Sequence, residues 1–141
     1  MKITIEQALA MFSIVKQVSY KDVKSDKISL IWLKLYPIVK EWDDAQMAAN
    51  KDVEEVRKSF EAEVANLSEE EKQSKMQDID RRFREAVDAL PSVKAQPALL
   101  KEEREADIPT ITEEEYIAIT HCECFKNIGE VAPIAILIGN E

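Results

Sequence analysis

The sequence predicts a mainly α-helical protein in which a long antiparallel helical hairpin joins a small helical head. The 141 residues include only 2 glycines, at positions 129 and 139, so the turn glycines that β-rich folds need are missing from most of the chain. Apolar residues between positions 27 and 66 recur every three or four places, which is the spacing of one helix face. Helix starts are marked by three Ser/Thr-x-x-Glu/Gln capping patterns: Thr4 with Gln7, Ser68 with Glu71, and Thr112 with Glu115.

The first segment, "MKITIEQALAMFSIVKQV", predicts a short strand followed by a helix. Ile3 and Ile5 alternate with Thr4, as in a strand, and the first capping pattern then starts a helix at Thr4. A lysine-rich loop follows, and its Ser25 or Asp26 can cap the next helix.

One continuous helix is predicted from Lys27 to about Asn66, since its stripe of apolar residues is unbroken. Pro37 removes a backbone hydrogen bond, so we expect a kink or break there. Residues 28–42 are apolar nearly all round, which requires other elements on every side. Beyond position 42 the stripe narrows and needs only one partner.

The partner is the helix predicted from "NLSEEEKQSKMQDIDRRFREAVDALP", which ends before Pro91. A tight turn at positions 67–68 would place Phe60 opposite Met76 and Val53 opposite Phe83. Apolar side chains would then meet along the whole antiparallel hairpin.

The C-terminal third predicts shorter elements. Pro97 suits the first position of a short helix. Residues 107–111 form an extended segment that could pair with residues 2–5 as a two-stranded ribbon, where Pro109 would restrict it to an edge. The apolar run "VAPIAILIGNE" is either a buried strand or a short buried helix, and the helix is favoured.

These elements predict a single domain over residues 1–141. Its head gathers residues 1–42 and 91–141 around the all-round apolar helix, and its stalk is the hairpin 43–90.

The net charge of -9 is unevenly distributed, because residues 1–40 carry an excess of lysine and the rest of the chain is acidic. An acidic surface disfavours nucleic acid, whose phosphates require a basic stripe. The basic region, which includes Lys21, Lys24 and Lys27, either docks an acidic partner, such as the stalk of another copy, or is an ordinary solvated loop.

The predicted location is the cytoplasm. No apolar run approaches the roughly 20 residues that span a bilayer, and the N-terminal segment resembles mature protein more than a signal peptide. Cys122 and Cys124 are too close in sequence for a low-strain disulfide, which fits a reducing compartment.

The stretch "THCEC" contains the only histidine and both cysteines, His121, Cys122 and Cys124. A structural zinc site needs four nitrogen or sulfur ligands, so we expect apolar packing by at least one cysteine instead. No glycine-rich phosphate loop or Ser/His/Asp pattern is present, and the many carboxylates suit a solvated face. We therefore expect no enzyme activity, catalytic residue, metal or cofactor.

Two candidate binding surfaces remain. Trp32 and Tyr36 lie off the main apolar stripe, so either the head covers them or they form an exposed patch that a protein partner buries. In the alternative, the protein sequesters a small ligand such as a nucleotide signal between subunits. The cluster Arg81, Arg82 and Arg84 would then bind phosphate, unless these arginines only form surface salt bridges.

The start "MKITIEQAL", the acidic hairpin, the stretch "READIPTITEEEYIAI" and the apolar tail together resemble small acidic helical proteins encoded by bacteriophages and prophages. The resemblance covers most of the chain in outline and brings no established catalytic residues. It implies a phage origin, a bacterial host cytoplasm and a role in assembly, host takeover or anti-defence. The implied partner is a second copy or another phage or host protein.

Overall fold

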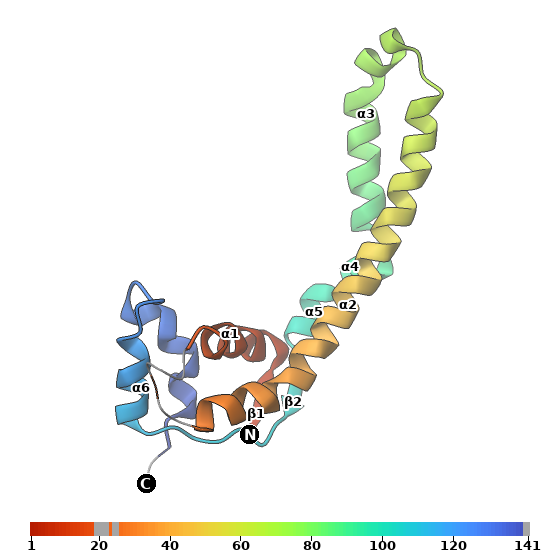
Figure 1. Cartoon of the computed structure of the whole chain (residues 1–141). Coiled ribbons are helices and arrows are strands. Elements are labelled where there is room, and N and C mark those ends of the chain that lie inside the picture. Colours follow the sequence, from red (N-terminus) through yellow and green to blue (C-terminus); the bar gives the residue numbers. More distant parts are fainter. Residues whose placement is uncertain (19–22, 24–25, 140–141) are drawn as a thin grey trace. The chain divides into compact units, whose positions relative to one another are not determined.

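The computed structural model of the chain describes residues 1–18, 23 and 26–139, and it confirms the predicted fold class (Figure 1). A long helix, a helical hairpin and a small two-stranded sheet are all present. By contacts the chain divides into two compact units. Unit 1 comprises Met1–Trp42 and Leu100–Glu141, and unit 2 comprises Asp43–Leu99. Each unit is described separately below.

Unit 1 begins with strand β1 (Lys2–Thr4) and helix α1 (Ile5–Val15). The predicted capping box starts α1, because the Gln7 backbone N–H donates to Thr4 Oγ1 (3.1 Å) and the Thr4 backbone N–H donates to Gln7 Oε1 (2.9 Å). Both donors at the helix start are therefore satisfied locally. One apolar face of α1 is buried: Ile5, Ala8, Met11, Ile14 and Val15.

Strand β1 pairs antiparallel with β2 (Glu103–Glu105), so the predicted pairing with residues 107–111 is wrong. The ladder is extended by backbone bonds from Ile5 N to Glu102 O (3.0 Å) and from Ala106 N to Met1 O (2.9 Å). The polar segment 103–105 has no apolar alternation, so its backbone hydrogen bonds could not be read from the hydropathy pattern. Within 107–111, residue Ile111 instead forms an isolated parallel bridge with Ile138.

Helix α2 runs without interruption from Asp26 to Ala65 and contributes its first part to unit 1 and its second part to unit 2. Of the kink or break predicted at Pro37, a break does not occur, because α2 continues across it. Pro37 is exposed, so solvent can satisfy the carbonyl that its ring leaves unbonded. Neighbouring buried residues fix the helix on its other side: Ile28, Ile31, Leu35, Ile38 and Val39. Ser25, the other predicted cap, lies outside the described residues.

The C-terminal part of unit 1 closes its core. Helix α6 (Glu113–Thr120) begins with the predicted capping box of Thr112 and Glu115. The apolar tail forms a 3₁₀ helix, η1 (Ile128–Leu137), so the helical alternative is confirmed. Its buried side chains are Val131, Ile134 and Leu137.

Unit 2 is the helical hairpin of the second part of α2 with α3 (Glu69–Asp88), but its register differs from the predicted one. The Phe60 ring packs edge-on against Phe83, with centroids 5.7 Å apart, and Arg82 Nη2 lies 2.6 Å from Glu63 Oε1. Phe60 is thus paired with Phe83, which the predicted register assigned to Val53.

The register differs from the predicted one because of the distance that the turn between α2 and α3 can span. The single extended residue Ser68 spans about 3.5 Å, whereas packed helix axes lie about 8–10 Å apart. The first turns of α3 therefore cross beyond the end of α2 before the two helices run side by side (Figure 1).

Helices α4 (Pro91–Lys94) and α5 (Gln96–Leu100) follow α3. The start of α5 agrees within one residue with the predicted helix at Pro97. Ser92 Oγ donates to Asp52 Oδ2 (2.7 Å), which ties α4 to α2 within unit 2. Across residues 1–18, 23 and 26–139, the longest helices are too polar, and the apolar ones too short, to cross a lipid bilayer.

Candidate interaction surfaces

An aromatic ladder links α1 to α2 in unit 1. The rings of Trp32 and Tyr36 stack with centroids 5.3 Å apart, because side chains four residues apart lie on the same helix face. Phe12 of α1 approaches Trp32 with a centroid distance of 5.5 Å. Aromatic pairs at these distances attract one another, so each ring fixes the next.

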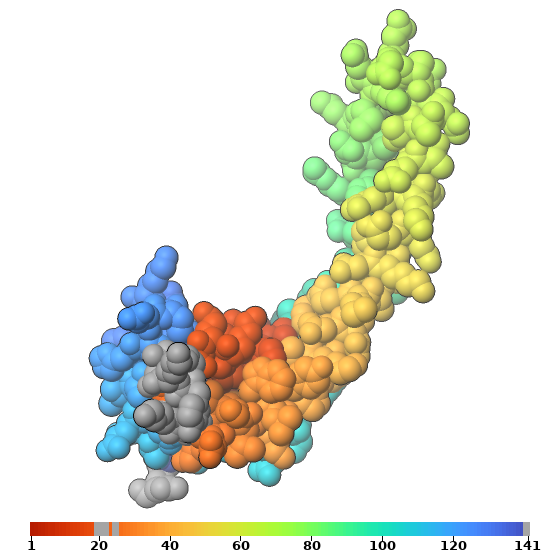
Figure 2. Space-filling view, viewed as in Figure 1, coloured from red at the N-terminus to blue at the C-terminus, as the bar shows by residue number. Residues whose placement is uncertain are grey.

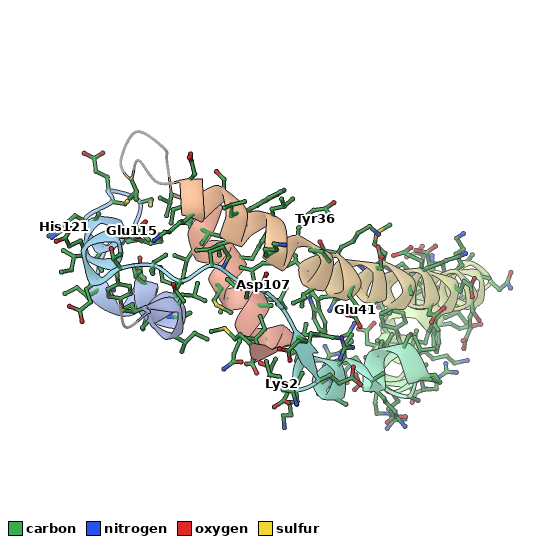
Figure 3. The ribbon with its side chains drawn as sticks, turned by 90° about the horizontal axis from the view of Figure 1, so that it is seen from below. Lys2, Tyr36, Glu41, Asp107, Glu115 and His121 are labelled. Carbon is green, nitrogen blue, oxygen red and sulfur yellow. The ribbon has the colours of Figure 1, made fainter. Side chains whose placement is uncertain are left out.

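The ladder is part of a solvent-exposed surface, which we call the aromatic face. The exposed fractions are 37% for Trp32, 44% for Tyr36 and 56% for Leu33. Of the two predicted possibilities for Trp32 and Tyr36, the exposed patch is the one found. Figure 2 shows the first part of α2, in orange, at the surface, and Figure 3 shows Tyr36 and Glu41 on opposite sides of α2. The aromatic face comprises Phe12, Trp32, Leu33 and Tyr36.

A small pocket of about 240 Å³ lies beside Trp32. Its walls come from the end of α1 and the start of α2, and include Val15, Ile28 and Ser29. A pocket of this size next to an exposed aromatic ring can accept one side chain of a partner.

Three lysines lie on the part of α2 that carries the aromatic face. Between Asp26 and Glu41, α2 carries Lys27, Lys34 and Lys40 but no acidic residue. Lys27 Nζ is bonded to Glu115 Oε1 at 3.1 Å, and Lys34 is exposed. Lys40 follows Tyr36 by one helical turn and therefore lies on the same side of α2 as the ladder. Lys21 and Lys24, which the sequence assigned to the same basic region, lie outside the described residues.

A carboxylate–guanidinium cluster holds β2 against α2 in unit 1. Arg104 Nε and Nη2 donate to the two Glu41 carboxylate oxygens at 3.0 and 2.6 Å, and Nη2 also lies 2.7 Å from Glu102 Oε2. The hydrogen bonds from Arg104 hold the pKa of Glu41 below its usual value. Sequence reasoning missed this cluster because Glu41 and Arg104 are distant in sequence and neither belongs to a recognisable motif.

The predicted arginine cluster lies on α3 in unit 2, and acidic side chains surround it. Arg81 pairs with Asp78, and Arg82 pairs with both Glu63 and Asp78. Hydrogen bonding to Glu63 raises the pKa of Arg82. Arg84 lines a shallow depression of about 320 Å³ together with Arg81 and three acidic residues: Asp80, Glu85 and Asp88.

Carboxylates at this density compete with a phosphate for the guanidinium groups and repel it. The geometry therefore favours the surface salt bridges that the sequence offered as the simpler interpretation of these arginines.

A second apolar surface lies in unit 2, between α2 and α3. It is an open groove of about 450 Å³, which we call the hairpin groove. The Phe60–Phe83 pair forms part of its wall, and Met76 at its edge is 38% exposed. The side chains lining it are Arg57, Phe60, Glu61, Val64, Ala65, Met76, Ile79, Asp80 and Phe83. The sequence predicted this apolar strip but placed it inside a closed hairpin.

The residues of "THCEC" differ in their burial. Cys122 is buried, as expected for a cysteine that packs in a core, while Cys124 and His121 are exposed. In the part of the chain that the structure describes, no three His, Cys, Asp or Glu side chains gather into a potential metal site.

Comparison with known proteins adds no relative to this description. No protein-family model, curated protein sequence or solved structure matches the chain. Functional inference therefore depends on the surfaces themselves.

Proposed function

We propose that this chain is a non-enzymatic protein–protein interaction or assembly protein that binds its partner through the aromatic face. The observation that carries the proposal is the stacked Trp32–Tyr36 pair, held by Phe12 yet open to solvent. Tryptophan and tyrosine dominate the energetic centres of protein interfaces, because they bury a large area at little cost in conformational entropy.

The surroundings indicate the chemistry of the partner. The lysines of α2 would attract a surface whose apolar centre is bordered by carboxylates, and such complementarity speeds association and fixes orientation. The pocket beside Trp32 has room for one anchor side chain. In line with the resemblance to phage proteins, we propose a phage-encoded origin and a partner from the phage or its bacterial host.

Site-specific photocrosslinking tests the proposal. A benzoylphenylalanine placed at Leu33, which is 56% exposed, reports any protein that covers the aromatic face in the cells that encode the chain. We expect a discrete adduct from position 33. The matched control is the same probe at Glu114, an exposed position on α6 of the same unit, which should give none.

The adduct should disappear when Trp32→Ser and Tyr36→Ser are combined, with helicity by circular dichroism unchanged. Equal adducts from positions 33 and 114, or an adduct that survives the double substitution, would contradict binding through the aromatic face.

A further inference from the structure

Unit 2 buries too little of its own apolar surface. Among the residues that the structure describes in unit 2, only Ala49 and Ile79 are buried apolar side chains. Phe60 and Phe83, the largest apolar side chains of the hairpin, remain partly exposed, and Met76 is 38% exposed. Helices of this length depend on the burial of an apolar face for stability, so the hairpin groove is a face that lacks its cover.

Two polar contacts join the helices of unit 2. Glu63 pairs with Arg82, and Asp52 accepts a hydrogen bond from Ser92. None of these four residues lines the hairpin groove.

Both helices of the hairpin carry the same apolar spacing. Successive apolar positions are separated by three, four, four and three residues in each case. The two series are Val53, Val56, Phe60, Val64 and Leu67, and Met76, Ile79, Phe83, Val87 and Leu90. The residues of the two series that line the hairpin groove are Phe60, Val64, Met76, Ile79 and Phe83. A second copy offers the same apolar side chains at the same helical spacing, and two hairpins packed together form a four-helix bundle.

The rim of the groove carries both signs of charge. Arg57 lies on one rim beside Glu61, and Asp80 lies on the other. A two-fold interface places the same patch of each copy against the other, so a rim of mixed sign can pair with itself, whereas a rim of one sign would repel itself. We infer that the hairpin groove is filled by the hairpin of a second copy of this chain, in a two-fold dimer centred on Phe60 and Met76.

Sedimentation equilibrium of the full chain tests this inference. We expect a mass that rises with concentration to twice the 16.1 kDa of one chain. Met76→Glu places a charge at the groove edge and should raise the dimer dissociation constant at least about 100-fold. The matched control is Gln77→Glu, which adds the same charge at the next residue, outside the groove, and should leave the dissociation constant unchanged.

A second pair of variants, which exchange charges on the rim, tests the inference even if Met76→Glu unfolds the hairpin. Arg57→Glu and Glu61→Arg alter exposed rim positions, and each alone should weaken the dimer about 10-fold or more. An equimolar mixture of the two variants should dimerise more tightly than either alone. A wild-type chain that stays monomeric up to its solubility limit would overturn the inference. So would a dimer equally stable in Met76→Glu, or a mixture that dimerises no more tightly than its components.

Discussion

The two parts of α2 can be compared directly, because one helix supplies side chains to both units. In unit 1, the α2 residues that face inward are buried, and Leu35 is buried completely. In unit 2, Val56 and Phe60 occupy equivalent stripe positions and stay partly exposed. An apolar stripe therefore shows where a helix can be buried, while the number of elements packed around it decides whether it is.

This difference also separates the two proposed surfaces. The aromatic face lies outside a core that unit 1 completes by itself, so its exposure is compatible with a stable free protein. The hairpin groove is the incomplete core of unit 2. A partner on the aromatic face would bind to a unit whose core is already complete. A partner in the hairpin groove would complete the core of unit 2 and thereby stabilise that unit.

The largest effect is expected from truncating the core of unit 1. Leu35→Ala should lower the free energy of unfolding by about 2–5 kcal/mol, because Leu35 is fully buried and the cavity cannot be filled by solvent. Urea denaturation measures this change. Leu33→Ala, on the exposed side of the same helix, is the control and should shift stability by no more than about 0.5 kcal/mol. Similar losses at both positions would refute the contrast between buried and exposed sides of α2.

Amide hydrogen exchange along α2 should reveal the difference in local stability between the two units. At low micromolar concentration, backbone amides near Val56 should exchange about 100-fold faster than those near Leu35, because fewer apolar contacts oppose local opening in unit 2. Raising the protein concentration should slow exchange near Val56 alone, provided that the hairpins pair. Equal protection at both positions at every concentration would show that unit 2 is as stable as unit 1.

The close approach of Gly139 to Thr110 can be tested in the C-terminal part of unit 1. A Cβ at position 139 would lie 2.8 Å from Thr110 Oγ1 and 2.9 Å from Thr110 Cβ. Gly139→Ala should therefore lower the unfolding free energy by about 1–3 kcal/mol in thermal or urea denaturation. Gly129→Ala is the milder control, since its nearest neighbour is a side-chain oxygen of Asn127 at 3.1 Å. Addition of Thr110→Gly should recover part of the loss, and failure to do so would point to another cause.

A smaller effect is expected from the Glu41–Arg104 pair as the pH falls. Because Arg104 lowers the pKa of Glu41 in the folded state, this pair stabilises the protein above the pKa of Glu41 in the unfolded chain. The contribution is lost as the pH falls through the lower, folded-state pKa. Carboxylates titrate between about pH 6 and pH 3. Over this range, the free energy of unfolding should therefore fall less steeply with pH for Arg104→Gln than for wild type. Identical pH profiles would mean that Arg104 does not bind Glu41 in solution.

The smallest effect is expected from the arginines of α3. Arg81→Gln should change the unfolding free energy by less than about 0.5 kcal/mol, because the ion pair of Arg81 with Asp78 is exposed. In a thermal-shift screen, nucleotides should leave the melting temperature unchanged. A nucleotide that raised it, with the rise lost in Arg81→Gln and Arg84→Gln but kept in Lys94→Gln, would instead favour the small-ligand alternative.

The sequence by itself determined the helical fold class, the extent of the hairpin and two complete capping boxes. These features depend on interactions between residues a few positions apart, such as Thr4 with Gln7 and Thr112 with Glu115. It also singled out Trp32 and Tyr36, because apolar residues off the main stripe of a helix are visible in one dimension.

The tertiary structure alone decided the partner of β1, the register of the hairpin and the exposure of the aromatic face. Arg104 lies opposite Ile3 and binds Glu41, a contact between residues far apart in sequence that no local pattern encodes. Phe60 pairs with Phe83 because the first turns of α3 must span the distance between two helix axes. Such contacts follow from which elements meet in space, and a periodicity shared by both parts of α2 could not show that only one of them lies in a closed core.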